Sequence, residues 1–376
     1  MAKESIREKL CSTPLVIKAY YDEAAPVKEK NVGIFVHTLG EGGSQRAVEA
    51  LIPRLERAGY GVYILSSEDG KYAQIYSENY GACVLVLDEM SCVLGEGRAS
   101  MRLFDLVVIN SFCSDMFSLY YADTEIPCIW WSHEGNEVVD NYIKNLNQTL
   151  IRSKNFVYAF PWVNPMSLWE QTYPEVKTAY LPIEVKDSYT GATNTGEKVR
   201  FFVPGSYKTY KGFHIALQAF ITMMATGMTD FEAIFCGYDH DSEYYKTLEK
   251  ACEKYSNIKL LGELDQSEMD EQFSEADCVV IPTTLDAGPL TAVEALMHKD
   301  ILVISDAAGV SGIIQDCVNG FVYPSDNVVE LYKRLIMVYH DKASLEGIAA
   351  GGRSIYEEFF ASEAMDVAFD ELMSEL

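Results

Sequence analysis

The sequence predicts a doubly wound α/β protein with two domains, and three observations carry this prediction. An apolar run, a glycine turn and an amphipathic helix follow one another over residues 32–58, and the same order returns over residues 199–223. This order is typical of the first strand, turn and helix of a Rossmann-like parallel sheet. Residues 187–198 lie between the two copies and are mostly polar, without hydrophobic periodicity. We expect them to be a linker.

The composition is that of a soluble globular protein, with 48% hydrophobic and 23% charged residues. The formal net charge of −26 argues against nucleic acid and anionic lipid as general partners, because both are negatively charged. A nucleotide diphosphate would also be repelled at long range, so a site for it needs a local concentration of positive charge.

The cysteines and the hydropathy of the chain bear on its location. The nine cysteines are scattered singly and include no Cys-x-x-Cys pair, which fits a reducing compartment. The first ten residues contain no apolar segment of the signal-peptide type, and no apolar run approaches membrane-spanning length. We therefore expect a cytoplasmic protein without a transmembrane segment. Peripheral binding at the inner membrane face stays open.

Residues 1–30 are expected to form an N-terminal extension, in which residues 14–21 are either a strand or a short helix. The first domain then covers residues 31–186, where apolar runs recur at the spacing of βαβ units. These runs lie at residues 32–37, 59–65, 82–87, 105–110, 127–131, 156–160 and 177–182. Gly42 and Gly43, after the first run, permit close approach of the backbone to a ligand at a helix N-terminus. A tight turn with positive φ is the alternative.

His133 comes directly after the apolar run at residues 127–131. Ligands of open parallel sheets bind beyond the carboxyl ends of the strands, so we expect His133 to face a ligand. The alternative is a histidine that is hydrogen-bonded within a helix cap. Pro53 lies inside the helix that follows Gly43, and we expect it to kink that helix.

The second domain is expected over residues 199–355. Its predicted strands lie at residues 199–205, 231–237, 258–262, 277–282 and 301–305, with a helix at 267–275 and a hairpin-like segment at 318–323. The turn Tyr238–Asp241 contains an Asp-x-Asp pair, which can chelate a divalent metal. Because no third acid or His follows at ligand spacing, we expect a turn with solvated acids and no metal.

Residues 284–297 are the most informative stretch, because they follow a buried strand and open an Ala- and Leu-rich helix. Gly288 can serve as the N-cap and Pro289 as the first helical residue. The amides of Leu290 and Thr291 would then form an anion site at the positive end of the helix. Asp286 in the loop and Glu294 one turn into the helix flank this end. A ligand with both phosphate and hydroxyl groups, such as a nucleotide sugar, fits these residues. The alternative is two solvated acids.

Asp286, seven intervening residues and Glu294 resemble the acid-x7-Glu signature of family 4 of the glycosyltransferases, which are retaining enzymes with the GT-B fold. Gly42 and Gly43 are similar to that family's Gly-Gly-x-x-Arg opening. Two departures stand beside these matches. Asp286 replaces the more usual Glu, and Ser206 takes the place of the Arg in the family's Gly-Arg, spacer, Lys-Gly motif. Gly205, Lys211 and Gly212 match the rest of that motif, and Lys208 is positioned to supply the lost charge.

The resemblance implies two Rossmann-like domains that face each other across a cleft. It also implies that residues 356–376 form a helix that crosses back to the N-terminal domain. Met365, Phe369 and Leu372 stand at helical spacing there.

The resemblance also implies the site. Lys211, Asp286 and His133 would be the catalytic residues, with Asp286 on sugar hydroxyls and His133 near the transferred sugar. Glu294 would bind the ribose. The residues expected to bind the donor are Gly42, Gly43, Gly205, Ser206, Lys208, Lys211, Gly288, Leu290, Thr291 and Glu294.

The expected activity is transfer of a sugar from a nucleotide-sugar donor, most commonly a UDP-sugar in the family, with retention at the anomeric carbon. The acceptor would be a hydroxyl of a glycan, a lipid-linked saccharide or a small molecule. No metal and no other cofactor is implied. Ser206 and Asp286 motivate a second hypothesis, in which the chain is an inactive accessory subunit of a partner transferase. A nucleotide-sugar epimerase is a third.

Overall fold

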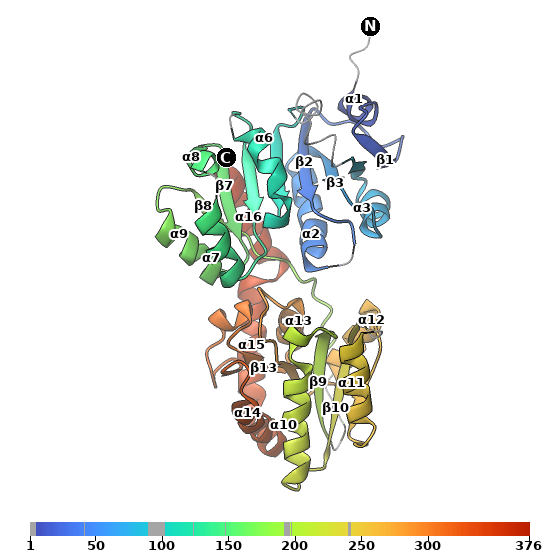
Figure 1. The fold of residues 1–376 in the computed structure, drawn as a ribbon, viewed down its shortest axis with the longest axis vertical. Coiled ribbons are helices and arrows are strands. Elements are labelled where there is room, and N and C mark those ends of the chain that lie inside the picture. Colours follow the sequence, from blue (N-terminus) through green and yellow to red (C-terminus); the bar gives the residue numbers. More distant parts are fainter. Residues whose placement is uncertain are drawn as a thin grey trace. The chain divides into compact units, whose positions relative to one another are not determined.

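The computed structural model describes residues 5–40, 42–88, 102–122, 124–146, 148–191, 196, 198–239 and 242–376. The chain divides into two compact units, and Figure 1 shows their strands and helices. Unit 1 contains Met1–Glu184 and Met365–Leu376, and unit 2 contains Val185–Ala364. The end of the chain thus belongs to the same unit as its beginning. In the described ranges, no helix combines the length and the apolar character that crossing a membrane requires.

Unit 1 is built on an eight-stranded sheet with the order β1-β4-β3-β2-β5-β6-β7-β8. Its strands are β1 (Val16–Tyr20), β2 (Lys30–Val36), β3 (Tyr60–Ser66), β4 (Cys83–Leu87), β5 (Leu106–Asn110), β6 (Cys128–Trp131), β7 (Phe156–Phe160) and β8 (Thr178–Tyr180). All neighbouring pairs are parallel except β1 and β4. The strand order reverses between β2 and β5, which makes this pair the topological switch point of the sheet.

The helices of unit 1 connect the strands and complete its core. They are α1 (Ile6–Cys11), α2 (Gly43–Arg57), α3 (Tyr72–Tyr80), α6 (Ser118–Tyr121), α7 (Asn136–Asn145), α8 (Gln148–Arg152), α9 (Val163–Thr172) and most of α16 (Ser362–Ser374), with the 3-10 helix η1 (Phe112–Phe117). Helix α1 begins at a capping box, in which the Ser5 hydroxyl accepts from the Glu8 amide and the Glu8 carboxylate accepts from the Ser5 amide. Residues 14–21, expected as strand or helix, contain strand β1.

Helix α16 is attached to unit 1 by apolar contacts and by charge. Met365, Phe369 and Leu372 are buried. Arg54 of α2, which is only 4% exposed, pairs with Glu184 at 2.6 Å and with Asp366 of α16 at 2.7 Å. A buried guanidinium needs such partners, because an unpaired charge in the interior is strongly unfavourable.

Unit 2 has a six-stranded sheet with the order β11-β10-β9-β12-β13-β14, in which every neighbouring pair is parallel. Its strands are β9 (Val199–Ser206), β10 (Phe231–Tyr238), β11 (Ile258–Leu260), β12 (Cys278–Ile281), β13 (Ile301–Ser305) and β14 (Phe321–Tyr323). Counted from the start of the unit, this is the Rossmann order 3-2-1-4-5-6. The switch point lies between β9 and β12.

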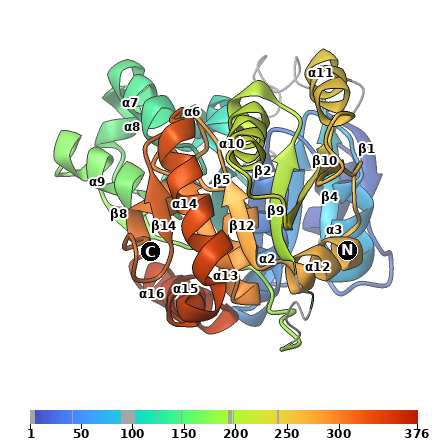
Figure 2. The ribbon, with the colours of Figure 1, turned by 90° about the horizontal axis from the view of Figure 1, so that it is seen from below.

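Helices cover both faces of this sheet. They are α10 (Phe213–Ala225), α11 (Glu243–Cys252), α12 (Gln266–Glu275), α13 (Leu290–His298), α14 (Val328–Asp341) and α15 (Glu346–Phe359), with the 3-10 helices η2 (Thr209–Lys211), η3 (Gly309–Ile313) and η4 (Lys342–Leu345). Helices α10 and α14 pack against each other, as Figure 2 shows. The side chains of β9 alternate between the faces: Phe201 contacts Phe220 of α10, whereas Phe202 contacts Phe273 of α12.

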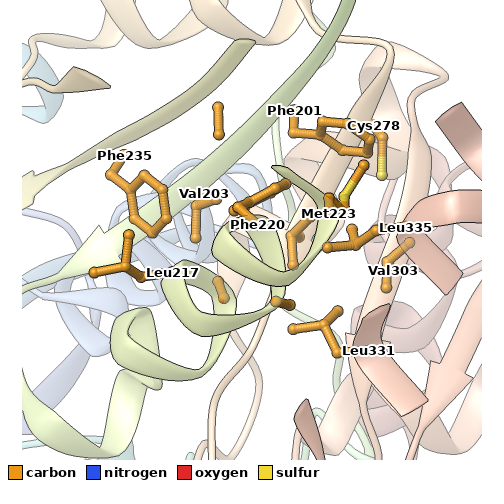
Figure 3. Packing of buried hydrophobic residues seen from close by; sticks show 14 of the residues in the cluster. Phe201, Val203, Leu217, Phe220, Met223, Phe235, Cys278, Val303, Leu331 and Leu335 are labelled. Atoms are coloured by element: carbon orange, nitrogen blue, oxygen red, sulfur yellow. The ribbon is translucent and has the colours of Figure 1, made fainter. Parts of the chain in front are cut away.

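The core under α10 and α14 is closely packed and almost wholly apolar. Figure 3 shows residues from β9, β10, β12 and β13 meeting side chains of both helices. They include Phe201, Val203, Leu217, Phe220, Met223, Phe235, Cys278, Val303, Leu331 and Leu335. This core holds the carboxyl ends of the central strands in fixed positions and therefore supports the loops that follow them.

The structure differs from two local expectations in unit 2. Residues 318–323 do not form a hairpin, because β14 pairs in parallel with β13, with Phe321 opposite Val303. The residues before β14 make a tight turn, in which the Cys317 amide donates to the Gly320 carbonyl at 2.8 Å, and no partner strand precedes it. Helix α13 begins at Leu290 with Pro289 as its N-cap, one residue later than expected.

Candidate functional site

Two loops leave the carboxyl ends of the strands at the switch point of unit 2. One follows β9 and reaches α10 through Lys208, Lys211 and Gly212, and the other follows β12 and reaches α13 through Asp286. Sequence reasoning placed candidate ligands on both loops, which are about 75 residues apart in the chain; the structure brings them together. The switch point of an open parallel sheet is where ligands of such folds bind.

The carbonyl of Tyr210 joins the two loops. It accepts hydrogen bonds from the Thr284 amide at 2.7 Å, the Thr283 hydroxyl at 2.9 Å and the Thr284 hydroxyl at 3.2 Å. Gly212 makes a second close approach, since a Cβ atom there would lie 1.9 Å from the Pro282 carbonyl oxygen and its φ is +72°. Only glycine fits such a position without a shift of the backbone.

Lys211 and Asp286 form an ion pair between the loops. Their side chains are 23% and 12% exposed, so the pair is mostly shielded from water. Burial lowers the pKa of Lys211, but the adjacent Asp286 carboxylate more than offsets this and holds the pKa above its ordinary value. Lys211 is therefore a cation at neutral pH, placed at the start of α10 and bound to the loop that leads into α13.

The loop around Asp286 is fixed by its backbone as well. The Asp286 side chain accepts from the Gly288 amide at 3.1 Å, and its carbonyl accepts from the Gly309 amide at 2.9 Å. A Cβ atom at Gly309 would lie 1.6 Å from the Ala287 carbonyl oxygen, so these segments are in direct backbone contact. The carboxylate of Asp286 is thus held in place rather than solvated on a free turn.

Helix α13 points its N-terminal end at this loop. Among the described residues, no acceptor is bound to the amides of Leu290 and Thr291, the first two helical residues. These amides, with the positive end of the helix dipole, are suited to bind an anion. Glu294, one turn further on, is only 2% exposed and does not lie on a wet face of the helix. The reading of two solvated acids is therefore wrong for both Asp286 and Glu294.

At the end of β9, Ser206 takes the place of the arginine in the family's Gly-Arg, spacer, Lys-Gly motif. Ser206 is buried, and its hydroxyl has no hydrogen-bond partner among the described residues. Lys208 does not join Lys211, because its ammonium group pairs with Asp239 at 2.9 Å. Asp239 is thus an ion-pair partner, and its side chain is still 35% exposed. The remaining residues of the proposed acidic turn, His240 and Asp241, lie outside the described residues.

Unit 1 carries the other candidates at its own switch point. Gly42, whose φ of 172° is extended, is the N-cap of α2, and Gly43 is the first residue of that helix. The tight turn with positive φ is therefore wrong for this pair. The side-chain amide of Asn110, at the end of β5, donates to the Ser44 carbonyl at 3.3 Å and ties the start of α2 to the sheet.

His133 follows β6 and is held by the same Asn110. Because the amide nitrogen of Asn110 faces Ser44, its oxygen is left to accept from Nε2 of His133, at 2.7 Å. Nδ1 of His133 then carries a lone pair, and it is buried without a partner among the described residues. Burial, and next the nearby His37, lower the pKa of His133 to about 3, so the ring is neutral. The helix-cap alternative is wrong, since the bond goes to the end of a neighbouring strand.

Three residues of these sites escaped sequence reasoning. Tyr210 acts through its backbone, which no residue pattern reveals. His37 and Asn110 end the predicted strands at residues 32–37 and 105–110, and the parallel-sheet rule that pointed to His133 would have found them too. The described residues contain no group of three or more His, Cys, Asp or Glu side chains that could hold a metal ion.

Comparison with known proteins agrees with this architecture. Residues 188–354 match the family model of the glycosyl transferases group 1. No curated protein matches the chain in sequence. Solved structures with similar folds include a glycosyltransferase from Rickettsia africae, with a TM-score of 0.77 and 14% identity over 92% of this chain and 98% of that one.

Two further structures have the same fold. Anabaena HepE in complex with UDP-glucose has a TM-score of 0.73 and 14% identity, and covers 92% of this chain and 100% of its own. Sucrose-phosphate synthase from Thermosynechococcus elongatus has a TM-score of 0.70 and 13% identity over 92% of this chain and 99% of its own. The expected fold class is thus confirmed. The chain has the GT-B fold, and its residues 188–354 match the model of the group 1 glycosyl transferases.

Proposed function

We propose that this glycosyltransferase moves a sugar from a UDP-sugar to an acceptor hydroxyl with retention at the anomeric carbon, without a metal ion. The observation that carries the proposal is the Tyr210 contact, which places Lys211 beside Asp286 and the start of α13. A lysine, two amides without acceptors and a helix dipole form a compact anion site in a strongly acidic protein. Once Asp286 releases Lys211, these groups supply the local positive charge that a diphosphate requires.

The ion pair suggests how the donor enters this site. Without a donor, the charges of Lys211 and Asp286 cancel. A diphosphate carries more negative charge than one carboxylate and can also accept from the amides of Leu290 and Thr291. It should therefore take over Lys211, which releases the Asp286 carboxylate to accept from sugar hydroxyls. Charge that develops on the departing diphosphate would be stabilised by the same groups.

The remaining candidates have roles that suit their positions. Glu294 offers a buried carboxylate one turn into α13, which suits hydrogen bonds from ribose hydroxyls. His133 offers a neutral Nδ1 acceptor at the carboxyl edge of the unit 1 sheet, which suits a hydroxyl of the transferred sugar. Gly42 and Gly43 leave room at the start of α2 for a phosphate or sugar. In this scheme the diphosphate accepts the proton of the acceptor hydroxyl.

Uridine is our choice of base because HepE, a structure of the same fold, has been solved with UDP, with UDP and glucose, and with UDP-glucose. The acceptor is a hydroxyl of a glycan, a lipid-linked saccharide or a small molecule. A cytoplasmic location completes the proposal, on the grounds of the unpaired cysteine pattern.

One observation favours a second candidate, an inactive accessory subunit of a partner transferase. Ser206 takes the place of the motif's arginine, and Lys208 forms an ion pair with Asp239. The diphosphate would then meet one cation, Lys211, where the motif provides two. Such a subunit could keep nucleotide binding while it lacks turnover.

The test has two stages. A thermal-shift panel with UDP, GDP and ADP measures binding, and we expect UDP to raise the unfolding temperature most. UDP-sugars are then incubated with the protein, and released UDP is quantified with and without acceptor sugars. Slow donor hydrolysis and faster transfer, with the anomeric configuration of the product kept in its NMR spectrum, support the proposal. Binding without hydrolysis or transfer favours the accessory subunit. Inversion at the anomeric carbon, or no nucleotide binding, contradicts the proposal.

A further inference from the structure

The N-terminal extension packs on one face of the unit 1 sheet. Leu10 of α1 is buried in the same apolar cluster as Tyr63 of β3 and Cys83 of β4, and Cys11 packs against that cluster. Strand β1 then pairs antiparallel with β4, with Tyr20 opposite Val84. The extension is therefore an added layer on β3 and β4 and an added edge strand, rather than a free tail.

Arg7 holds the extension in a closed shape. Its guanidinium donates to the Asp22 carbonyl at 3.0 Å and to the Ala25 carbonyl at 2.6 Å, and it lies 5.5 Å from the centre of the Tyr21 ring. These bonds join α1 to the segment that follows β1. They therefore tie α1, which carries Cys11 in its last turn, to the other end of the extension.

Cys11 packs against the apolar cluster that contains Cys83, and the two thiols lie close enough for each to affect the pKa of the other. Cys11 is partly exposed and Cys83 is buried in strand β4. Two cysteines can be joined without movement of the backbone only where their side chains lie close together. The contact spans the extension and the sheet.

The two thiols differ in their surroundings, and their pKa values are therefore shifted in opposite directions. The hydrogen bond from Cys83, opposed by burial and assisted by the positive charge of Arg7, lowers the pKa of the Cys11 thiol to about 7. The hydrogen bond to Cys11 and burial raise the pKa of the Cys83 thiol well above its ordinary value. Cys11 is thus a partly exposed thiolate near neutral pH, and Cys83 is its protonated neighbour.

We propose that Cys11 and Cys83 form a redox modification site, at which hydrogen peroxide closes a reversible disulfide between the N-terminal extension and strand β4. The Cys11 thiolate attacks one peroxide oxygen, the O–O bond breaks, and hydroxide leaves and is protonated to water. The Cys83 sulfur then attacks the sulfenic sulfur of Cys11. The S–O bond breaks, and the oxygen departs as a second water with the Cys83 proton. Two thiols lose two electrons, and one peroxide gains them.

The full-length protein, reduced and then freed of reductant, is titrated with hydrogen peroxide, and free thiols are blocked with N-ethylmaleimide. Trypsin with Asp-N separates the peptide of Cys83, residues 72–87, from Cys92, because Asp-N cuts before Asp88. We expect mass spectrometry to show residues 10–18 linked to residues 72–87, and dithiothreitol to remove the link. The matched control is Cys113→Ser, an exposed cysteine of the same unit, in which the link should form as in the wild type.

Two variants make the result specific. Cys11→Ser changes a partly exposed residue, so it should fold, and in it Cys83 should stay reduced. Cys83→Ser keeps a hydrogen-bond donor beside Cys11 but cannot form the disulfide, so it should leave Cys11 as a sulfenic acid that dimedone labels. A circular dichroism spectrum checks its fold. Peroxide that oxidises Cys113 while Cys11 and Cys83 remain free thiols contradicts the proposal. A disulfide from Cys11 to a cysteine other than Cys83 also contradicts it.

Discussion

Replacement of Lys211 by methionine tests whether the anion site of unit 2 binds the diphosphate. The change keeps most of the side-chain volume and removes the charge. A charge-assisted hydrogen bond contributes about 1.5–3 kcal/mol. Its loss should weaken UDP binding by roughly 10- to 150-fold. Turnover of a UDP-sugar should fall by about a hundredfold or more, because a preorganised charge acts mainly on the leaving diphosphate.

Asp286→Asn should change UDP affinity in the opposite direction. The carboxylate competes with the diphosphate for Lys211, so its removal should tighten UDP binding. If the mostly shielded pair is worth about 1 kcal/mol, the gain is about fivefold. Transfer should nevertheless fall, since Asp286 is proposed to hold sugar hydroxyls. Opposite signs for the two residues of one ion pair distinguish an anion site from an ion pair that only stabilises the fold.

Stability must be separated from binding in this test. Lys211→Met leaves a carboxylate that is 12% exposed without its cation, which destabilises unit 2. The double variant, with Asp286→Asn as well, removes that unpaired charge and should recover stability while UDP binding stays weak. Lys259→Met, which breaks the exposed pair with Glu232, is the matched control and should bind UDP normally. Isothermal titration calorimetry gives the affinities. Equal UDP affinity in the wild type and Lys211→Met would refute the reasoning, as would weaker binding in Asp286→Asn.

Three further predictions concern stability, and chemical denaturation measures each of them. Arg54→Met should lower the free energy of unfolding by about 2–4 kcal/mol, because it removes the guanidinium partner of Glu184 and leaves Asp366 with Arg57 alone. The exposed Arg57→Met should cost under about 1 kcal/mol, because Asp366 keeps Arg54. His133 is neutral in the folded protein, whereas in the unfolded chain it gains a proton below about pH 6.5. Its effect on the free energy of unfolding is therefore unfavourable between about pH 6.5 and 3. Over that range the wild type should lose about 1.4 kcal/mol of stability per pH unit more than His133→Gln. Gly212→Ala should destabilise the protein by about 2 kcal/mol or more. As a control, Gly347→Ala should stabilise it by about 0.5–1 kcal/mol, because a Cβ atom at this position of helix α15 meets no atom within 4 Å. The reverse order would contradict the close approach at Gly212.

The fold class was predictable because its signals are local and repeated. Central strands of parallel sheets are buried on both faces, so they stand out as apolar runs, and residues 32–37 and 301–305 are found as β2 and β13 almost unchanged. The segment at 318–323 was misread for a physical reason. A glycine turn before an apolar run is typical of a hairpin, but a strand can also add in parallel to a sheet edge, and the short run does not distinguish the two.

The candidate site was predictable in its residues but not in its contacts. Lys211 and Asp286 were found from separate motifs, and each was expected to face a ligand. Their pairing depends on how far two loops reach beyond β9 and β12, and no local pattern specifies that distance. The same holds for Lys208, whose partner Asp239 follows the neighbouring strand β10. Charge patterns in a sequence identify candidates, whereas loop geometry decides which charges neutralise each other.

Tyr210 shows most clearly why the contacts of the site could not be predicted from its side chains. Its carbonyl is the acceptor for three donors of Thr283 and Thr284, so the two loops are connected through a group that every residue possesses. Substitution of Tyr210 cannot remove that carbonyl, but Thr284→Val removes one hydroxyl donor and leaves the amide donor in place. The connection should therefore survive Thr284→Val. One backbone oxygen thus sets the spacing of a cation and a helix N-terminus, and because Ser206 takes no part in these bonds, that spacing does not depend on an arginine at position 206.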